Sequence, residues 1–369
     1  MAEYTIGIEE EFQLIDPVTR SLRSSVSEIL KSGKDVLGEQ LKQEMFQAMV
    51  EVGTSICSDV TEARDEVISL RRSVAELAEA AGCKLVAAGT HPFTDWESLD
   101  ITPHERYIEL ENNLQDIARS IAVYGLHVHV GIPDRDLAIE LMNEVRYFLP
   151  HILALSVNSP FWEGRDTGIK SYRSVIWGRM PRSGIPDTFS SWDDYRRFVE
   201  MLIATNSIDE PKKIWWDIRP HPTFQTLEFR VCDMPTRVDE TVALAALFQA
   251  LVAKLARLRS QNLGFRIYPR AFVNENRWRA MRYGVEGNLV DFGRGIEIPM
   301  RELARELLQF VDDVVDDLGS RDALKTVYEI LDEGTGADRQ LRVYHEREDL
   351  TDVVDYLAEE TLRGVCAPA

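Results

Sequence analysis

The feature that most constrains the fold is a set of short segments in which apolar and charged residues alternate. In the first, Tyr4–Leu14, every second residue is apolar, with Glu10 as the exception. Successive side chains of a β-strand point to opposite faces, so this segment predicts a strand with one buried and one acidic face. The buried face would hold Tyr4, Ile6, Ile8, Phe12 and Leu14, and the acidic face Gly7, Glu9, Glu11 and Gln13.

Two later segments show the same pattern with different charged groups. In Gly125–Ile132, the imidazoles of His127 and His129 share the face opposite Leu126, Val128, Val130 and Ile132. In Thr226–Cys232, the residues opposite Leu227, Phe229 and Val231 are Thr226, Glu228, Arg230 and Cys232, and upstream Trp215, Asp217 and Arg219 share a face in the same way. If helices cover the apolar side of such a sheet, its charged side becomes the floor of a cleft.

The rest of the chain predicts an α+β fold. Further strands are expected at 47–56 and 84–88, and helices from the N-cap signal at 58–62 to about Gly82, then over 103–122, over 134–151 and after Ser191. From Asp239 onward the chain reads almost entirely as helix. Early strands and a helical last third favour one α+β unit over a doubly wound sheet. We therefore expect residues 1–369 to form a single domain.

Composition limits the classes of partner. The net charge of −20 disfavours nucleic-acid binding, because the surface would repel a phosphate backbone. The cysteines, Cys57, Cys83, Cys232 and Cys366, form no CxxC pair and indicate a reduced protein without a disulfide framework. The N-terminus lacks the pattern of a signal peptide, and we expect a cytoplasmic protein without a membrane span.

A nucleotide would have to be bound without a phosphate-binding loop. The chain contains neither GxxxxGK[ST] nor GxGxxG, and Gly334-Thr335-Gly336 is interpreted as a turn between helices. The long segment 158–184 is rich in Gly, Pro, Arg and Trp without clear periodicity, and we interpret it as a mobile lid that carries Arg173.

The charged strand faces suit metal ions. Glu9 and Glu11 point the same way, and two carboxylates that close repel each other unless cations neutralise them. The structural alternatives are a solvent-facing edge for this pair, a hydrogen-bonded pair lining a polar cleft for the two histidines, and an ordinary ion pair for Glu228 and Arg230. Together, however, the oxygen-rich donors favour magnesium.

Seven motifs in order give the chain a specific resemblance to the carboxylate–amine ligase branch of the type 2 glutamate–cysteine ligase family. The resemblance covers nearly the whole chain. The motifs are Gly7-Ile8-Glu9-Glu10-Glu11, Gly89-Thr90-His91-Pro92-Phe93, Glu105-Arg106-Tyr107, His127-Val128-His129-Val130-Gly131, Trp216-Asp217-Ile218-Arg219-Pro220, Glu228-Phe229-Arg230 and Arg282-Tyr283-Gly284-Val285-Glu286-Gly287.

The resemblance implies a glutamine-synthetase-like catalytic domain, in which a curved, mostly antiparallel sheet is packed by helices on one face. It implies ATP and Mg²⁺ or Mn²⁺ as cofactors. By motif position, the metal ligands would be Glu9, Glu11, Glu51, His127 and Glu228, with Glu44 as a further one. Glu44 lies seven residues before Glu51, which gives opposite strand parity, so a bulge would be needed to aim both inward. Catalysis is assigned to Arg230, Arg173 and Glu228, and contacts with the nucleotide phosphates to Arg230, Arg173 and Arg219.

The reaction implied by the resemblance is amide formation between a carboxylate and an amine through an acyl phosphate, with release of ADP and phosphate. Glutamate and cysteine are the family's best-known substrates, and family habit implies a homodimer. Two alternatives stay open, a metal-dependent amide hydrolase, because HxH at a strand end also occurs there, and a non-catalytic small-molecule binding protein of the same fold.

Overall fold

A seven-stranded sheet forms the middle of the computed structural model, which describes residues 4–365. The strand order is β10-β11-β5-β1-β3-β2, and β4 also pairs with β1. All pairings within the sheet are antiparallel, as predicted. The strands are β1 (Ile6–Ile15), β2 (Leu41–Gln43), β3 (Met49–Gly53), β4 (Lys84–Val86), β5 (Gly125–Gly131), β10 (Ile218–Pro220) and β11 (Thr226–Asp233).

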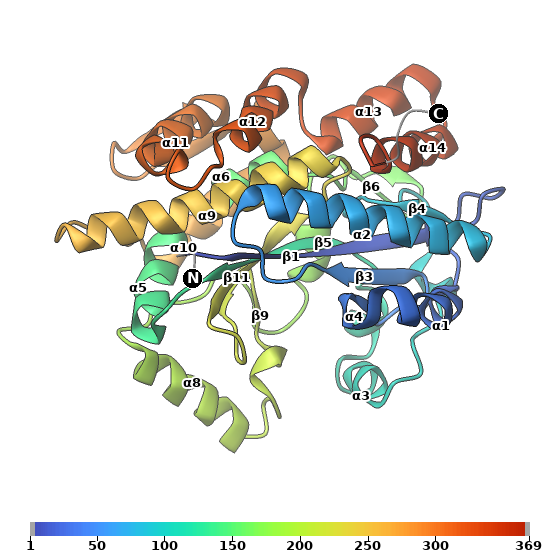
Figure 1. The fold of residues 1–369 in the computed structure, drawn as a ribbon, viewed down its shortest axis with the longest axis horizontal. Helices are drawn as coiled ribbons and strands as arrows, with labels where there is room; N and C mark the ends of the chain where they lie inside the picture. The colour runs from blue at the N-terminus through green and yellow to red at the C-terminus, as the bar shows by residue number, and fades with distance from the viewer. Residues whose placement is uncertain (1–3, 366–369) are drawn as a thin grey trace.

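Helices cover one face of this sheet in two layers (Figure 1). The first layer contains α2 (Val60–Ala80), α6 (Leu149–Ser156) and α9 (Val238–Ser260). The second contains α11 (Met300–Val315), α12 (Arg321–Glu333) and α13 (Gly336–Arg347), whereas α14 (Leu350–Thr361) packs directly against β4. On the opposite side, α3 (Glu105–Leu114) and α8 (Trp192–Ala204) project at two ends of the sheet, and the face between them is not covered by a helix layer.

Smaller elements complete the described chain. The helices are α1 (Val26–Leu37), α4 (Asp116–Arg119), α5 (Arg135–Val145), α7 (Tyr172–Trp177) and α10 (Arg270–Tyr283). Two-stranded pairs are formed by β6 (Phe161–Trp162) with β7 (Arg165–Asp166), β8 (Ser183–Gly184) with β9 (Trp215–Trp216), and β12 (Asn288–Asp291) with β13 (Ile296–Pro299).

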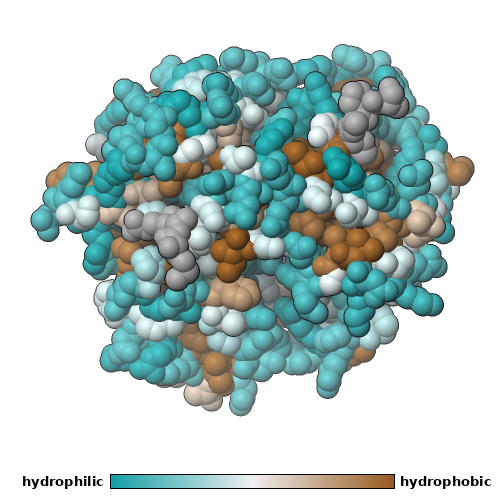
Figure 2. All heavy atoms as spheres, in the orientation of Figure 1, coloured by the Kyte–Doolittle hydropathy of each residue, from teal (hydrophilic) through white to brown (hydrophobic). Residues whose placement is uncertain are grey.

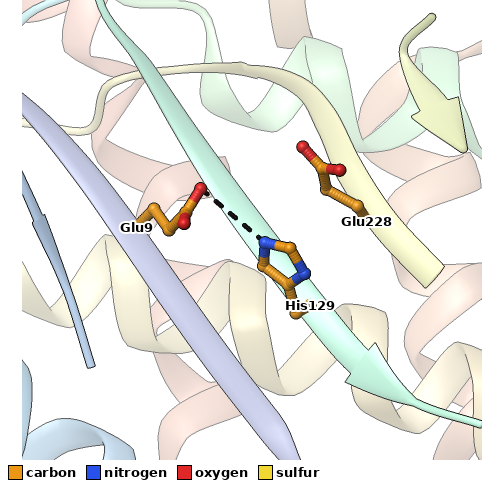
Figure 3. A group of neighbouring side chains, drawn as sticks. All are labelled: Glu9, His129 and Glu228. Carbon is orange, nitrogen blue, oxygen red and sulfur yellow. Dashed lines mark ion pairs between the residues drawn. The ribbon is translucent and has the colours of Figure 1, made fainter. Parts of the chain in front are cut away.

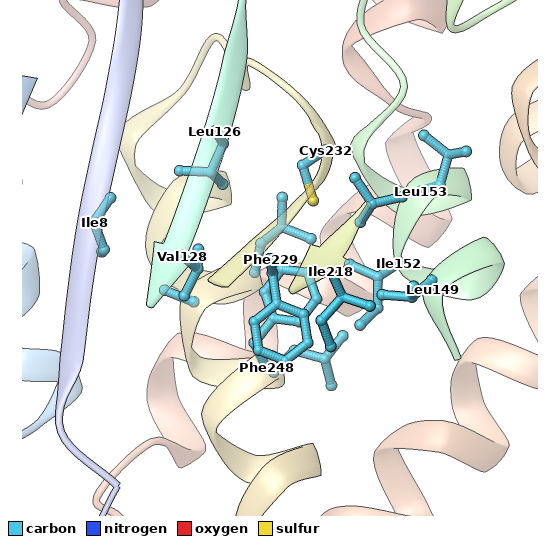
Figure 4. Packing of buried hydrophobic residues seen from close by; sticks show 14 of the residues in the cluster. Ile8, Leu126, Val128, Leu149, Ile152, Leu153, Ile218, Phe229, Cys232 and Phe248 are labelled. Carbon is cyan, nitrogen blue, oxygen red and sulfur yellow. The ribbon is translucent and has the colours of Figure 1, made fainter. Parts of the chain in front are cut away.

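The core lies between the apolar face of the sheet and the first helix layer. Phe229 of β11 stacks on Phe248 of α9 with ring centroids 4.1 Å apart, and Ile8, Leu126 and Val128 pack beside them (Figure 4). Within residues 4–365, α9 is the one helix long and apolar enough to cross a membrane, and most of its apolar window is buried in this core. The face of the molecule shown in Figure 2 is mostly hydrophilic, with apolar patches between the hydrophilic side chains. We therefore interpret α9 as a core helix.

A bulge in β11 corrects the predicted position of Cys232. Phe229 pairs with Val128 and Cys232 with Leu126, so three residues of β11 match two of β5. This irregularity shifts the parity of the strand, and Cys232 packs in the core on the same side as Phe229 (Figure 4). Cys57, Cys83 and Cys232 are buried free thiols, whereas Cys366 lies outside the described residues.

Two predicted helices are each divided into two. The segment 103–122 forms α3 and α4, because Gln115 adopts a φ of 52° between them. The segment 134–151 forms α5 and the start of α6. Pro150 was expected near the end of a helix, but it lies in the first turn of α6, a position where its missing N–H costs no hydrogen bond. The region from Asp239 onward, which was expected to be almost entirely helical, also contains the β12–β13 hairpin.

The segment 158–184 is less irregular than its composition suggested, and its role as a mobile lid stays a prediction. It contains β6, β7 and α7, and Ser159 and Ser171 anchor it by donating to the two carboxylate oxygens of buried Asp233, each at 2.7 Å. Arg173 lies on α7 and is buried, and its amide donates to Ser159 Oγ at 3.0 Å. The Gly and Pro residues of this segment lie in turns between short elements. Because each element is short, the segment contains no periodic pattern long enough to predict a helix or a strand.

Candidate active site

A cavity of about 420 Å³ opens on the face of the sheet that carries no helix layer. Its floor is charged because the antiparallel register brings the predicted residues side by side. Glu9 pairs with His127, Glu11 with Glu51, and Glu228 with His129. The lining includes Glu9, Glu11, Lys42, Glu44, Glu51, His127, Trp177, Arg219, Glu228 and Arg230 from the floor, and Arg106, Tyr107, Lys212 and Lys213 nearer the rim.

Glu9, His129 and Glu228 come from three neighbouring strands and form one group of metal-ligand type (Figure 3). Each offers one ligand atom, and these atoms lie within 4.8 Å of one another. His129 Nε2 is 3.7 Å from Glu9 Oε2, is buried, and has no hydrogen-bond partner among the described residues. Its other nitrogen, Nδ1, lies 3.1 Å from Thr226 Oγ1. A histidine oriented by one nitrogen while the other is free is the usual arrangement of a metal ligand.

Glu9, Glu51 and His127 form a second group of the same kind. His127 Nδ1 lies 3.3 Å from Glu9 Oε2, and His127 Nε2 is 3.9 Å from Glu11 Oε1. Burial and the nearby Arg230 lower the pKa of His127 to about 4, so the imidazole is neutral at pH 7. Burial would raise the pKa of Glu9, but the neighbouring imidazoles of His127 and His129 hold it well below its ordinary value. A neutral imidazole and an ionised carboxylate are the forms in which these two side chains bind a cation.

The remaining carboxyls of the floor have raised pKa values. Burial and the neighbouring Glu51 raise the pKa of Glu11 to about 7, and burial and Glu11 raise that of Glu44 to about 7. Burial and the charges of Glu9 and Glu44 raise the pKa of Glu51 to about 8. These carboxyls therefore hold protons near neutral pH unless other cations compensate their charge.

Glu44 reaches this cluster by a route that differs from the predicted bulge. β2 and β3 are separate antiparallel strands, and Lys42 on β2 pairs with Glu51 on β3. Glu44 follows β2, two residues after Lys42, in the connection that reverses the chain. Since Lys42 and Glu51 are directly opposite each other, Glu44 lies on the same side as Glu51 without a bulge. Tyr107 of α3 supports this connection by donating to the Gln43 carbonyl at 3.2 Å.

Glu228 is held between two arginines. Arg219 donates to both carboxylate oxygens, at 2.7 and 3.0 Å, and Arg230 Nη1 donates to Oε1 at 2.5 Å. Burial would raise the pKa of Glu228, but Arg219 and Arg230 hold it well below its ordinary value. The predicted ion-pair alternative is thus present, and Glu228 stays an anion beside Glu9 and His129. Asp217 lies outside this floor, because it pairs with Arg277 of α10 at 2.6 Å.

The buried guanidinium groups of Arg173 and Arg230, near the cavity, retain unused donors. In the described part of the chain, the Nε atoms of Arg173 and Arg230 have no hydrogen-bond partner, although the residues are 3% and 9% exposed. Arg173 Nη2 lies 3.3 Å from the Arg230 carbonyl oxygen, and the Trp177 ring lies within 6.0 Å of both guanidinium carbons. A buried N–H that donates to nothing costs free energy, so the Arg230 donor suits an anionic ligand in the cavity. Arg173 does not line the cavity, and it packs against Arg230 and Trp177, which do.

Lys42 is a further charged residue of the floor that the sequence analysis missed. Its ammonium group donates to Glu9 Oε1 at 2.8 Å and to Glu51 Oε1 at 2.9 Å. Burial would lower the pKa of Lys42, but the charges of Glu51 and Glu9 raise it, so the side chain stays protonated. The sequence could have indicated this position, because Lys42 lies two residues before Glu44 and alternate residues of a strand share a face.

The donor set fits divalent cations. Carboxylates predominate over imidazoles, which is the preference of Mg²⁺ and Mn²⁺, and the unpartnered Nε2 of His129 is placed to complete a site with Glu9 and Glu228. Of the predicted ligands, Glu9 and Glu228 belong to the group that contains His129. Glu9, Glu51 and His127 form the second group. Glu11 and Glu44 line the same cavity.

Comparison with known proteins gives one consistent result. Residues 5–356 match the model of glutamate–cysteine ligase family 2. A relative named "Putative glutamate--cysteine ligase 2" from Solibacter usitatus (strain Ellin6076) is 53% identical over 366 residues, which cover 99% of this chain and 95% of the relative.

Two solved structures share the fold at low sequence identity. Glutamate–cysteine ligase from Francisella tularensis, in complex with AMP, has a TM-score of 0.73 at 11% identity, covering 100% of this chain and 91% of that one. A bifunctional glutathione synthetase from Pasteurella multocida has a TM-score of 0.69 at 14% identity, covering 98% and 53%. The fold is therefore that of this group of ligases.

Proposed function

Because the chain belongs to glutamate–cysteine ligase family 2 and is therefore an ATP-dependent ligase, we propose that it joins a carboxylate to an amine through an acyl phosphate. The observation that carries this proposal is the unused Nε donor of Arg230, which lines the cavity beside Glu9 and Glu228 and has Arg173 packed against it. Such a site can neutralise transferred phosphate from two sides, by guanidinium groups and by cations.

The chemistry follows from charge. A carboxylate oxygen of the first substrate attacks the γ-phosphorus of ATP, and the bond to the β–γ bridging oxygen breaks, so ADP leaves. The amine nitrogen then attacks the carbonyl carbon of the acyl phosphate, and phosphate leaves with the former carboxylate oxygen. Before the attack, the ammonium form of this substrate loses one proton to a carboxylate of the site, and the nitrogen loses a second proton to the departing phosphate as the amide forms.

The residues of the floor divide this work. Arg173 and Arg230 would donate to oxygens of the phosphoryl group in transfer, and Arg219 orients Glu228 by its two hydrogen bonds. Glu9, His129 and Glu228 would hold one divalent ion, and Glu11, Glu44 and Glu51, with His127 near them, would hold a further one. Bound Mg²⁺ or Mn²⁺ would neutralise phosphate charge, which is the chemistry that such ions supply.

For the substrates, we propose the γ-carboxylate of glutamate and the amino group of cysteine as the first pair to test, because the name of the relatives contains both. Arg106, Lys212 and Lys213 near the rim could pair with substrate carboxylates. The cytoplasmic location, the homodimer and the single-domain organisation stay predictions.

The reaction is tested by its products. With ATP, Mg²⁺, an amine and a carboxylate labelled with oxygen-18, we expect ADP, and one label per amide in the released phosphate. AMP would indicate an acyl adenylate, and unlabelled phosphate would contradict the acyl phosphate. Amide cleavage without ATP would favour the hydrolase alternative.

Matched variants tie the activity to this site. Glu228→Gln keeps the shape but removes the anion that faces Glu9 and His129, so ADP release should fall sharply while the fold stays intact by circular dichroism. Glu163→Gln, on the exposed β6–β7 turn, should behave like the parent protein. Equal ADP release by both variants would contradict the assignment.

A further inference from the structure

Lys42 occupies a position in the acidic floor that a cation would otherwise take. Glu9, Glu51 and His127 are close enough together to hold a metal ion, and Lys42 Nζ already contacts both carboxylates of this group, at 2.8 and 2.9 Å. The contact is fixed by the backbone, because Lys42 and Glu51 are directly opposite each other in the β2–β3 pair.

The ammonium group uses only one oxygen of Glu9. It contacts Oε1, whereas Oε2 of the same carboxylate faces His127 at 3.3 Å and His129 at 3.7 Å. The group Glu9, His129 and Glu228 can therefore bind a divalent ion through Oε2 while Lys42 stays in place. In the group Glu9, Glu51 and His127, by contrast, the ammonium already contacts two of the three members and occupies the space between their carboxylates.

We propose that Lys42 is a resident counter-cation that closes the position between Glu9 and Glu51 to divalent ions and so sets how many of them the site binds. This inference rests on the metal-binding role in the proposed function. A fixed ammonium neutralises the repulsion between the two carboxylates at all metal concentrations, which keeps the floor assembled before ATP and metal arrive.

The inference predicts a change in stoichiometry, measured without catalysis. Mn²⁺ bound per chain is counted from the electron paramagnetic resonance signal of free Mn²⁺ during titration, for the parent, Lys42→Met and Lys42→Arg. Methionine is close to lysine in length but neutral, so we expect Lys42→Met to bind one more Mn²⁺ per chain. Lys42→Arg keeps the charge and should bind as many as the parent.

Lys212→Met is the control for overall charge. Lys212 lines the same cavity and lies on its exposed rim, so this variant loses the same unit of charge without opening the position between Glu9 and Glu51. It should bind as many Mn²⁺ ions as the parent. An extra ion in Lys212→Met as well would show a general charge effect and overturn the proposal.

A second measurement covers the case in which Lys42→Met folds poorly. Without metal, and at a pH high enough to ionise Glu51, its thermal midpoint should fall below that of Lys212→Met, because Glu9 and Glu51 then repel, and saturating Mn²⁺ should restore it. If a folded Lys42→Met binds the same number of ions as the parent, the proposal is wrong, whatever the activity. If the parent binds Mn²⁺ but forms no ADP, the proposed function fails while the counter-cation inference stands.

Discussion

Glu10 is the residue that breaks the alternation of the first strand, and its partner explains why. It lies on the apolar face of β1 and is 1% exposed, and Arg71 of α2 donates to both of its carboxylate oxygens. The same guanidinium donates to the backbone carbonyls of Thr236 and Thr361, at 2.7 and 3.2 Å. One buried ion pair thus joins the sheet, α2, the segment before α9 and the end of α14.

We expect Arg71→Met to destabilise the protein by about 3–5 kcal/mol, because the substitution leaves Glu10 buried without its cation. Chemical denaturation of the purified protein measures this. Arg64→Met on the same helix removes only an exposed pair with Asp239 and should cost less than about 1 kcal/mol. Similar losses in the two variants would contradict this role of burial.

Arg230 gives a prediction for catalysis at the same scale. Arg230→Lys keeps the charge but loses the planar guanidinium group with its several N–H donors. The lysine therefore cannot donate to Glu228 and to a phosphoryl group at the same time. We expect kcat to fall by about 100-fold or more, as when a single preorganised donor is removed from a transition state. Steady-state ADP release measures this, and Arg165→Lys on the exposed β7 strand should leave kcat unchanged.

At the scale of elements, the start of β5 is fitted to α7. A Cβ atom on Gly125 would lie 2.2 Å from Nη2 and 2.8 Å from Cζ of Arg173. The Gly125 amide also donates to Glu11 Oε2 at 2.5 Å. The absence of a side chain at this position therefore lets a buried arginine and a floor carboxylate share one strand end.

Gly125→Ala should displace the Arg173 side chain, so ATP turnover should fall at least tenfold, about 1.4 kcal/mol of barrier, while the protein stays folded. Gly7→Ala is the matched control on β1, because its Cβ would meet the nearest atom, His129 Cβ, at an ordinary 3.5 Å. Turnover of Gly125→Ala equal to that of Gly7→Ala would show that the position of Arg173 does not matter.

At the scale of the whole molecule, the acidic floor couples stability to pH and metal. Glu11, Glu44 and Glu51 have pKa values of about 7, 7 and 8 in the folded protein, above the ordinary value of 4.5. Since the folded state binds these protons more tightly than the unfolded state, their contribution to stability is complete below about pH 4.5. It is lost as the pH rises through 7 to 8.

We therefore expect the metal-free protein to lose free energy of unfolding, on the order of a few kcal/mol, between pH 5 and 8.5. Saturating Mg²⁺ should reduce this loss, because the ions take over the charge that the protons compensated. Denaturation at several pH values with EDTA or with Mg²⁺ measures both. A metal-free stability that rises over this range would contradict the raised pKa values.

The sequence by itself determined the strands, their charged face and the helical covering of the other face. It could do so because strand parity is local, so Glu9, Glu11, His127, His129 and Glu228 are placed by their immediate neighbours. The helix breaks at Gln115 and before Pro150, and the short elements of 158–184, were missed because their patterns are too short to carry periodicity.

Only the tertiary structure decided which charged groups meet. The strand register pairs Glu9 with His127 and Glu228 with His129, and the reversal between β2 and β3 brings Lys42 onto Glu51. The bulge in β11 then turns Cys232 into the core. These pairings depend on hydrogen bonds between segments that are far apart in the chain. No local pattern of residues specifies which segments pair or in which register.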